Sequence, residues 1–140
     1  MEKTLAKMRL SGRVGVRYRD DRIELDITGN NMGVLIGRRG QTLDALQYIA
    51  TLAVNRKTGN FVPVQVDAGG YREKRRQSIQ SNALAAKQKV VRTGRKVALE
   101  PMNPAERRLV HMALSGDAEV VTYSIDEEPA RRVVVDLKRD

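Results

Sequence analysis

The chain has 140 residues, of which 41% are apolar, so it can form one ordinary domain or two very small ones around a hydrophobic core. It has no cysteine, a single histidine and no apolar run near the roughly 18 to 20 residues of a membrane span, so we expect a cytoplasmic protein without disulfide, metal, cofactor or membrane insertion. The formal net charge of +9 predicts a polyanionic partner.

The N-terminal segment predicts a short helix followed by a β-hairpin. Residues 2–10 are expected to form the helix, which ends at Ser11-Gly12. On both sides of a predicted turn at Asp20-Asp21, apolar and polar residues alternate, as in strands that bury one face. The apolar positions are Val14, Val16, Tyr18, Ile23, Leu25 and Ile27. We therefore expect a hairpin with one buried face.

Two helices and a strand are expected next. Residues 32–36 form a short apolar segment, and apolar residues at helical spacing predict a longer helix over residues 42–56. Valines alternate over residues 62–66 as in a strand, and Pro63 indicates that the N–H side of this strand is an edge or faces outward. The order of elements is αββααβ, which we interpret as a first domain over residues 1–69.

Between the two helices lies a glycine-flanked loop, Gly37-Arg38-Arg39-Gly40. Glycine lets the backbone approach a phosphate without a Cβ in the way, and the following helix presents its first N–H groups and its positive dipole end to the same anion. Arg38 and Arg39 would add charge-assisted contacts. A plain helix-helix turn with solvated arginines has the same pattern. The apolar segment before the loop and the amphipathic helix after it favour the phosphate-binding interpretation.

One long basic helix is expected in the middle of the chain. Residues 71–92 contain no proline or glycine, and Gly94 ends the helix. Residues 70–100 hold 9 basic and 2 acidic side chains, whereas residues 101–140 hold 6 and 8. The basic side chains either extend a nucleic-acid track or form a solvated face. They are Arg72, Lys74, Arg75, Arg76, Lys87, Lys89, Arg92, Arg95 and Lys96.

The C-terminal part predicts a strand, a helix and two further strands. Strands are expected at residues 97–99, 120–125 and 133–137, with a helix over residues 103–115. This βαββ order, together with the long basic helix before it, is interpreted as a second domain over residues 70–140. The fold class is therefore α+β.

The predicted helix at residue 103 carries the single histidine of the sequence. Asn103 as N-cap, followed by Pro104 and by Glu106, marks its start. Arg107 and His111 project from one face, as a phosphate-binding pair or as a surface arginine stacked on a structural histidine. The residues expected to pack inward are Leu109, Val110, Ala113 and Leu114. No second histidine, His-Glu-x-x-His sequence or carboxylate cluster accompanies this histidine, so we expect no enzyme activity.

These motifs belong to a longer resemblance. Residues 32–48, Met-Gly-Val-Leu-Ile-Gly-Arg-Arg-Gly-Gln-Thr-Leu-Asp-Ala-Leu-Gln-Tyr, resemble the type-II KH domain of the Jag family, also called the SpoIIIJ-associated (KhpB, EloR) family. Residues 97–111 resemble the start of the R-three-H domain that follows KH in this family, and its two defining residues correspond to Arg107 and His111. The resemblance extends over residues 14–137. It implies a type-II KH domain joined by a long basic helix to a small R-three-H domain.

By this resemblance the protein binds single-stranded RNA. KH loops of this kind clamp about four nucleotides of backbone, while the bases lie in a groove between a helix and a strand edge. The residues that the resemblance implies for RNA binding are Ile36, Gly37, Arg38, Arg39, Gly40, Arg107, Arg108 and His111. Val34 and Ile36 fit either the groove or the core.

The implied role is that of a post-transcriptional regulator linked to bacterial cell elongation, division or sporulation, with a small KH-only (KhpA-like) protein as partner. Two alternatives stay open: a protein-interaction scaffold, and a single-stranded DNA-binding module, since backbone clamping does not require the 2′-hydroxyl. Many Jag proteins begin with a further small domain and a linker, which nothing here resembles. The chain is therefore either a truncated or a short member, and functions of that part are not assigned.

Overall fold

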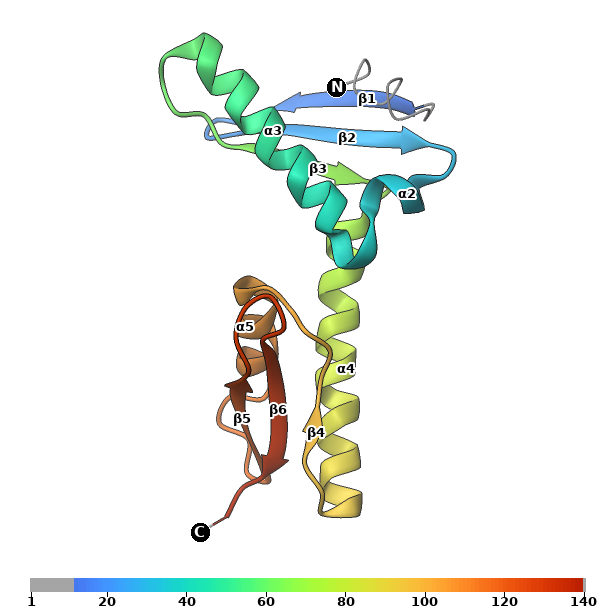
Figure 1. Cartoon of the computed structure of the whole chain (residues 1–140), viewed down its shortest axis with the longest axis vertical. Helices are drawn as coiled ribbons and strands as arrows, with labels where there is room; N and C mark the ends of the chain where they lie inside the picture. Colours follow the sequence, from blue (N-terminus) through green and yellow to red (C-terminus); the bar gives the residue numbers. More distant parts are fainter. Residues whose placement is uncertain (1–11, 140) are drawn as a thin grey trace. The chain divides into compact units, whose positions relative to one another are not determined.

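The computed structural model describes residues 12–139 and divides the chain into two compact units, Met1–Glu73 and Lys74–Asp140. Both units contain helices and strands, which confirms the predicted α+β class (Figure 1). The helix predicted over residues 2–10 lies outside the described residues. The domain boundary predicted between residues 69 and 70 stays a prediction.

The first unit is a three-stranded sheet with two helices and a helical turn. In chain order its elements are β1 (Gly12–Tyr18), β2 (Ile23–Gly29), α2 (Met32–Ile36), η1 (Arg38–Gly40), α3 (Gln41–Thr58) and β3 (Val64–Ala68). The strand order is β1-β2-β3, with β1 antiparallel and β3 parallel to β2. β3 is therefore an edge strand, as expected, but Pro63 lies before it, and its carbonyl accepts from the N–H of Ile23 in β2 at 2.9 Å.

The core of the first unit lies between the sheet and α3, which runs across one face of it (Figure 1). Leu43 and Leu46 of α3 pack against Ile27 of β2 and Val66 of β3, and these four side chains are at most 4% exposed. Full burial of such side chains stabilises a fold by about 1.5 to 3 kcal/mol each. This packing fixes the start of α3, and with it the preceding loop, against the sheet.

The hairpin of the first unit differs from the prediction in its burial. Its register joins Tyr18 to Ile23 as expected, but Val16 is 48% and Tyr18 80% exposed. Among the alternating positions of β1, only Val14 packs against the core. The prediction of one buried face for both strands is therefore wrong for most of β1, because β1 is the outer strand and the core gathers at β2 and β3.

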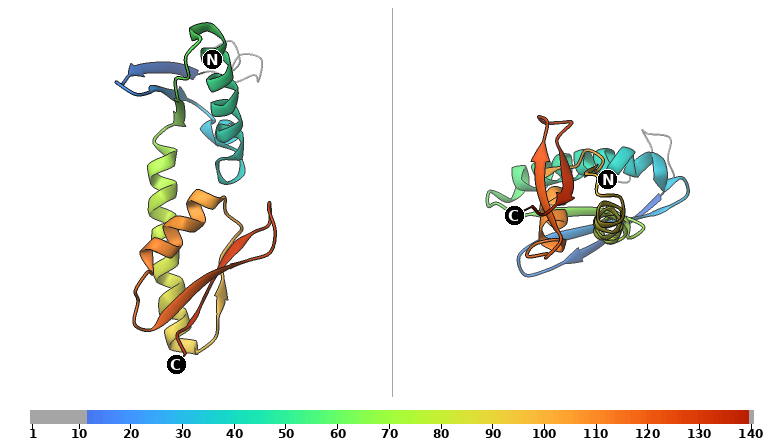
Figure 2. Two further views of the ribbon diagram at one scale, coloured as in Figure 1. Left: turned by 90° about the vertical axis from the view of Figure 1, so that its left-hand side faces the viewer. Right: turned by 90° about the horizontal axis from the view of Figure 1, so that it is seen from below.

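The second unit is a three-stranded antiparallel sheet packed against helices. The remaining elements are α4 (Tyr71–Thr93), whose first residues still belong to the first unit, β4 (Val97–Ala98), α5 (Pro104–Ala113), β5 (Val120–Ile125) and β6 (Arg132–Leu137). The strand order is β4-β6-β5. Figure 2 shows β5 and β6 as a long twisted pair next to α5. The long helix expected over residues 71–92 is confirmed, and Gly94 follows it at a φ of 72°.

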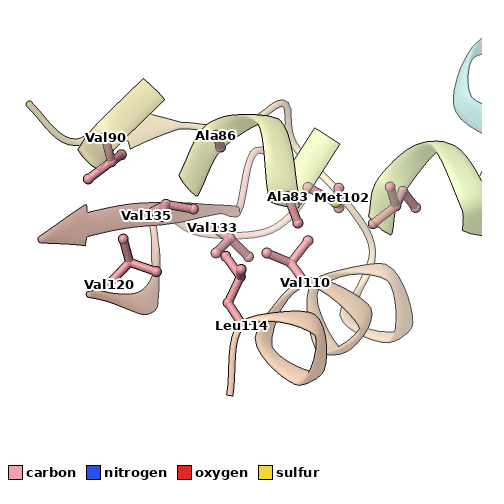
Figure 3. Close-up of a cluster of buried hydrophobic side chains, with 10 residues drawn as sticks. Ala83, Ala86, Val90, Met102, Val110, Leu114, Val120, Val133 and Val135 are labelled. Atoms are coloured by element: carbon pink, nitrogen blue, oxygen red, sulfur yellow. The ribbon is translucent and has the colours of Figure 1, made fainter. Parts of the chain in front are cut away.

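The core of the second unit is built from small and medium apolar side chains. Figure 3 shows α4, α5 and the strands contributing to one cluster. Its labelled members are Ala83, Ala86, Val90, Met102, Val110, Leu114, Val120, Val133 and Val135. The alanines of α4 leave room for close approach of the sheet, which favours tight packing.

The start of α5 confirms the predicted cap. The side chain of Asn103 accepts from the N–H of Glu106 at 2.8 Å, and the carboxylate of Glu106 accepts from the N–H of Asn103 at 3.1 Å. This reciprocal capping satisfies two N–H groups at the helix start. The inward face predicted for this helix is wrong at Ala113, which is exposed, because the buried positions are Arg107, Val110 and Leu114.

Candidate nucleic-acid interface

The Gly37-Arg38-Arg39-Gly40 loop interrupts the helices of the first unit. After α2 ends at Ile36, Gly37 has a φ of 73°, Arg39 of 55° and Gly40 of 78°, and α3 begins at the next residue. Three positive φ values in four residues are incompatible with a continuous right-handed helix. The chain therefore reverses direction in a tight loop that ends at the N-terminus of α3.

Both loop glycines are required by packing inside the protein. A Cβ on Gly37 would clash with the hydroxyl of Thr42, and one on Gly40 would lie 2.8 Å from Cε1 of Tyr71. The positive φ values add a second reason, since side chains disfavour this conformation. Sequence reasoning explained these glycines by phosphate approach alone. It missed Tyr71, because the contact depends on the tertiary fold.

The loop presents the chemistry of an anion site. The N-cap of α3 is Gly40, which has no side chain to bond the first N–H groups of this 18-residue helix. The N–H of Gln41 donates to the carbonyl of Arg38, but no side chain caps the N–H groups that follow it. These groups and the positive end of the helix dipole favour a phosphate there. Arg38 is exposed beside them, whereas Arg39 is half-buried.

The apolar residues before the loop take different positions. Val34 is 61% exposed and so is not a core residue. Ile36 is half-buried and packs against the core of the first unit. Val34 is thus the side chain that a bound strand could contact, and Ile36 mainly anchors the loop.

A groove runs along β3 in the first unit. It has a volume of about 380 Å³, within the range of small-ligand sites of about 300 to 1,000 Å³. The groove is lined by Arg22, Gln47, Pro63, Val64, Gln65 and Arg72. None of these was among the predicted site residues. Gln47 lies four residues after Leu43 and so shares its side of α3, but only the packing of α3 on β3 brings it to the groove.

Arg107 is the first of the two defining residues in the second unit, and the structure buries it. Its side chain is 10% exposed. Nη1 donates to the carbonyl of Met102 at 2.7 Å, and Nη2 lies 2.7 Å from Oε1 of Glu128. The expectation of a projecting arginine is therefore wrong, because the helix turns this side chain inward with Val110 and Leu114.

His111 lies one turn further along α5 and faces two hydroxyls of β5. Its Nδ1 is 2.7 Å from Oγ1 of Thr122, and its Nε2 is 3.2 Å from Oγ of Ser124. Burial and the positive charge of Arg107 lower the pKa of the imidazole below its usual value. The ring is therefore neutral at pH 7 and adds a hydrogen-bonding group but little charge.

The remaining predicted residue, Arg108, is exposed on α5. Two carboxylates that lie near His111 in the sequence are engaged with other residues. Glu106 caps α5 and lies 2.8 Å from Nε of Arg75, and Asp117 pairs with Lys87 at 2.5 Å. The hydrogen bond from Lys87 is the main cause that lowers the pKa of Asp117.

The basic residues around α4 divide into two groups. Arg72, Arg75 and Lys87 bond to carboxylates within their own units and so have structural roles. The others are exposed, namely Lys74, Arg76, Lys89, Arg92, Arg95 and Lys96. The exposed group alone is placed to meet a polyanion.

Within residues 12–139, no helix is both long and apolar enough to cross a bilayer. The same part of the chain contains no group of three or more histidine, aspartate or glutamate side chains arranged to hold a metal ion.

Comparison with known proteins adds independent findings. The model of the KhpA/KhpB KH domain matches residues 2–66, and the R-three-H domain model matches residues 77–137. The chain is 43% identical to an RNA-binding protein KhpB of Clostridium symbiosum, over 100% of this chain and 64% of the relative. It is 40% identical to that of Bacillus subtilis, over 84% of this chain and 57% of the relative. The chain thus spans about three fifths of these relatives.

Proposed function

The chain belongs to the KhpB family, which combines a KhpA/KhpB-type KH domain with an R-three-H domain, and from this premise we propose that it binds single-stranded RNA. The observation that carries the proposal is the loop over residues 37–40. It joins the uncapped N-terminus of α3 to an exposed arginine, Arg38. Backbone N–H groups and a guanidinium together suit a phosphodiester, and the names of the relatives identify RNA as the polymer that they bind.

The second unit contributes differently in this proposal. Arg108 is the exposed predicted residue and contacts phosphate. Arg107 and His111 hold α5 against β5 and the loop after it, and so shape the surface near the RNA. The exposed basic residues of α4 add attraction that depends on salt.

We place this activity in the cytoplasm and in post-transcriptional regulation. The link to cell elongation, division or sporulation rests on the family resemblance. Ultraviolet crosslinking in cells, with sequencing of the recovered RNA, tests the RNA binding and the regulatory role. Recovery of defined transcripts supports a regulator, and recovery of no RNA contradicts the proposal.

Arg38 provides the direct test of the loop. Arg38→Ala should weaken binding of a single-stranded RNA about fivefold or more, because one phosphate contact is lost. The slope of log binding constant against log salt should fall by about 0.7. Fluorescence anisotropy across a salt series measures both quantities.

Arg56→Ala is the matched control, because Arg56 is also exposed but lies at the opposite end of α3. It should change affinity by less than about twofold. Equal losses in the two variants would mean that binding follows net charge and not the loop. Competition between RNA and DNA of the same sequence then decides which polymer is preferred.

The scaffold alternative is favoured by one observation. On α3, Tyr48 is 66%, Ile49 55% and Leu52 53% exposed, which is a sizeable apolar surface for one helix. A small KH-only protein is the partner that the family resemblance suggests. Leu52→Lys should abolish co-elution with such a protein, whereas Lys57→Ala, at an exposed position in the last turn of α3 and on another side of it, should not. Co-elution that survives Leu52→Lys would exclude this surface.

A further inference from the structure

The outer edge of β3 borders the groove of the first unit. β3 pairs with β2 on one side only, so the backbone groups of alternate residues point away from the sheet. The N–H of Val66 donates to Oε1 of Gln47 at 3.0 Å, and its carbonyl accepts from Nε of Arg72 at 2.8 Å. The carbonyl of Val64 accepts a longer bond from the hydroxyl of Thr51 at 3.4 Å. Side chains therefore satisfy both backbone groups of Val66, whereas the contact to Val64 is weak because the hydroxyl of Thr51 also donates to the carbonyl of Gln47 at 2.8 Å.

Arg72 is the centre of this arrangement. Besides the carbonyl of Val66, its guanidinium donates to Oδ1 of Asp44 and to Oε1 of Gln47, each at 2.9 Å. The single oxygen of Gln47 thus accepts from both Val66 and Arg72. The planar fork of an arginine is well suited to hold three acceptors in fixed positions. We call Gln47 and Arg72, with their bonds to Val66, the edge seal.

We propose that the edge seal sets the base selectivity of the first unit, so that RNA is held by its backbone while its bases pass β3 unread. Reading a base requires a free donor or acceptor opposite its edge. Both backbone groups of Val66 are occupied, and the two side chains that occupy them, Gln47 and Arg72, line the groove. This inference rests on the proposed RNA binding and assigns Gln47 and Arg72 as its specificity-determining residues.

A purely protective role predicts a different outcome. Covered strand edges also prevent pairing with a second chain. If the edge seal served only that purpose, opening it would promote association of the protein but would leave base selectivity unchanged. The two roles are therefore separated by measuring affinity for different bases.

The experiment uses the full chain and fluorescent ten-nucleotide RNAs of adenine, cytosine or uracil. The unaltered protein should bind all three with affinities within about threefold of one another. Gln47→Ala frees the N–H of Val66 and loosens Arg72, so the spread should widen to about tenfold or more, which corresponds to ~1.4 kcal/mol. Arg56→Ala is the control, because Arg56 lies at the far end of α3 outside the groove, and it should leave the spread of affinities unchanged.

Amide hydrogen exchange at Val66, followed by NMR, reports whether the edge seal has opened. Faster exchange in Gln47→Ala with an unchanged spread of affinities overturns the inference, as does a tenfold spread in the unaltered protein. Failure of the unaltered protein to bind any of the three RNAs overturns the proposed function itself. Should Gln47→Ala not fold, Arg72→Lys keeps the charge, releases the carbonyl of Val66, and carries the same expectation.

Discussion

The two units use the residues that define their domains in opposite ways. In the first unit, the motif forms an exposed loop, where Arg38 faces solvent and the N–H groups of α3 have no side-chain cap. In the second unit, Arg107 is buried against Glu128 and Met102, and His111 is bonded to two hydroxyls. The comparison shows that a residue characteristic of a domain can act by holding the surface of the domain in place and does not need to contact the ligand itself.

The largest effect is expected at Arg107. Arg107→Ala leaves the carboxylate of Glu128 without its partner, leaves the carbonyl of Met102 without its donor, and opens a cavity beside α5. Glu128 is half exposed and can be hydrated, so the loss comes mainly from the buried carbonyl of Met102 and from the cavity, and together these cost about 2 to 4 kcal/mol. Urea unfolding of the second unit, followed by amide exchange of α5, measures the loss.

Arg108→Ala is the control for this change, because the neighbouring arginine is exposed and should alter stability by less than about 0.5 kcal/mol. If Arg107→Ala instead kept full stability and lost RNA affinity, Arg107 would be a direct contact. The contrast between the two units would then disappear.

A smaller effect is expected in the loop of the first unit. Gly37→Ala and Gly40→Ala should each destabilise this unit by about 1 to 3 kcal/mol, because both positions have positive φ and a Cβ would meet Thr42 or Tyr71. Gly33→Ala is the control, since a Cβ there meets nothing within 4 Å and its φ is not positive. Thermal unfolding compares the three variants.

The strain at Gly37 and Gly40 also affects how RNA binding by loop variants is interpreted. If Gly37→Ala lowers affinity, the loss includes distortion of the loop and does not measure a phosphate contact. Only a side chain that points to solvent, such as Arg38, separates the two causes. A Gly37→Ala variant as stable as Gly33→Ala would contradict the packing account.

The parts of the fold that could be predicted from the sequence are those fixed by local chemistry. The cap formed by Asn103 and Glu106 and the helix end before Gly94 depend on neighbouring residues alone. The strand expected from residue 62 begins instead at Val64, because the side chain of Asn55 bonds both the N–H and the carbonyl of Val62 and holds it outside the sheet. Such a contact between distant residues leaves no periodic signal.

The candidate site shows the same division. The spacing of the glycines located the loop, since a turn at a helix start depends on local backbone conformation. The spacing of Arg107 and His111 showed that they share a side of α5 but not that this side faces inward. Val110 and Leu114 mark the apolar side of α5, but an arginine on that side is expected to reach solvent, and only its bonds to Met102 and Glu128 explain its burial. The groove residue Gln47 was missed because its position there depends on the packing of α3 on β3, and Arg72 was considered only as a member of the basic series along α4.

The smallest effect expected is a dependence of stability on pH that is confined to the second unit. The pKa of His111 is lowered in the folded protein by burial and by the charge of Arg107, so the unfolded chain binds the proton more readily. The second unit should therefore keep its full stability above about pH 6.5 and lose a part of it as the pH falls through the folded pKa.

Urea unfolding at pH 7.5 and 5.5 measures the difference. His111→Gln should remove it, because the sequence contains no other histidine to titrate in this window. Loss of stability in the first unit over the same window would show that another group titrates there, and the proposed difference between the two units would fail.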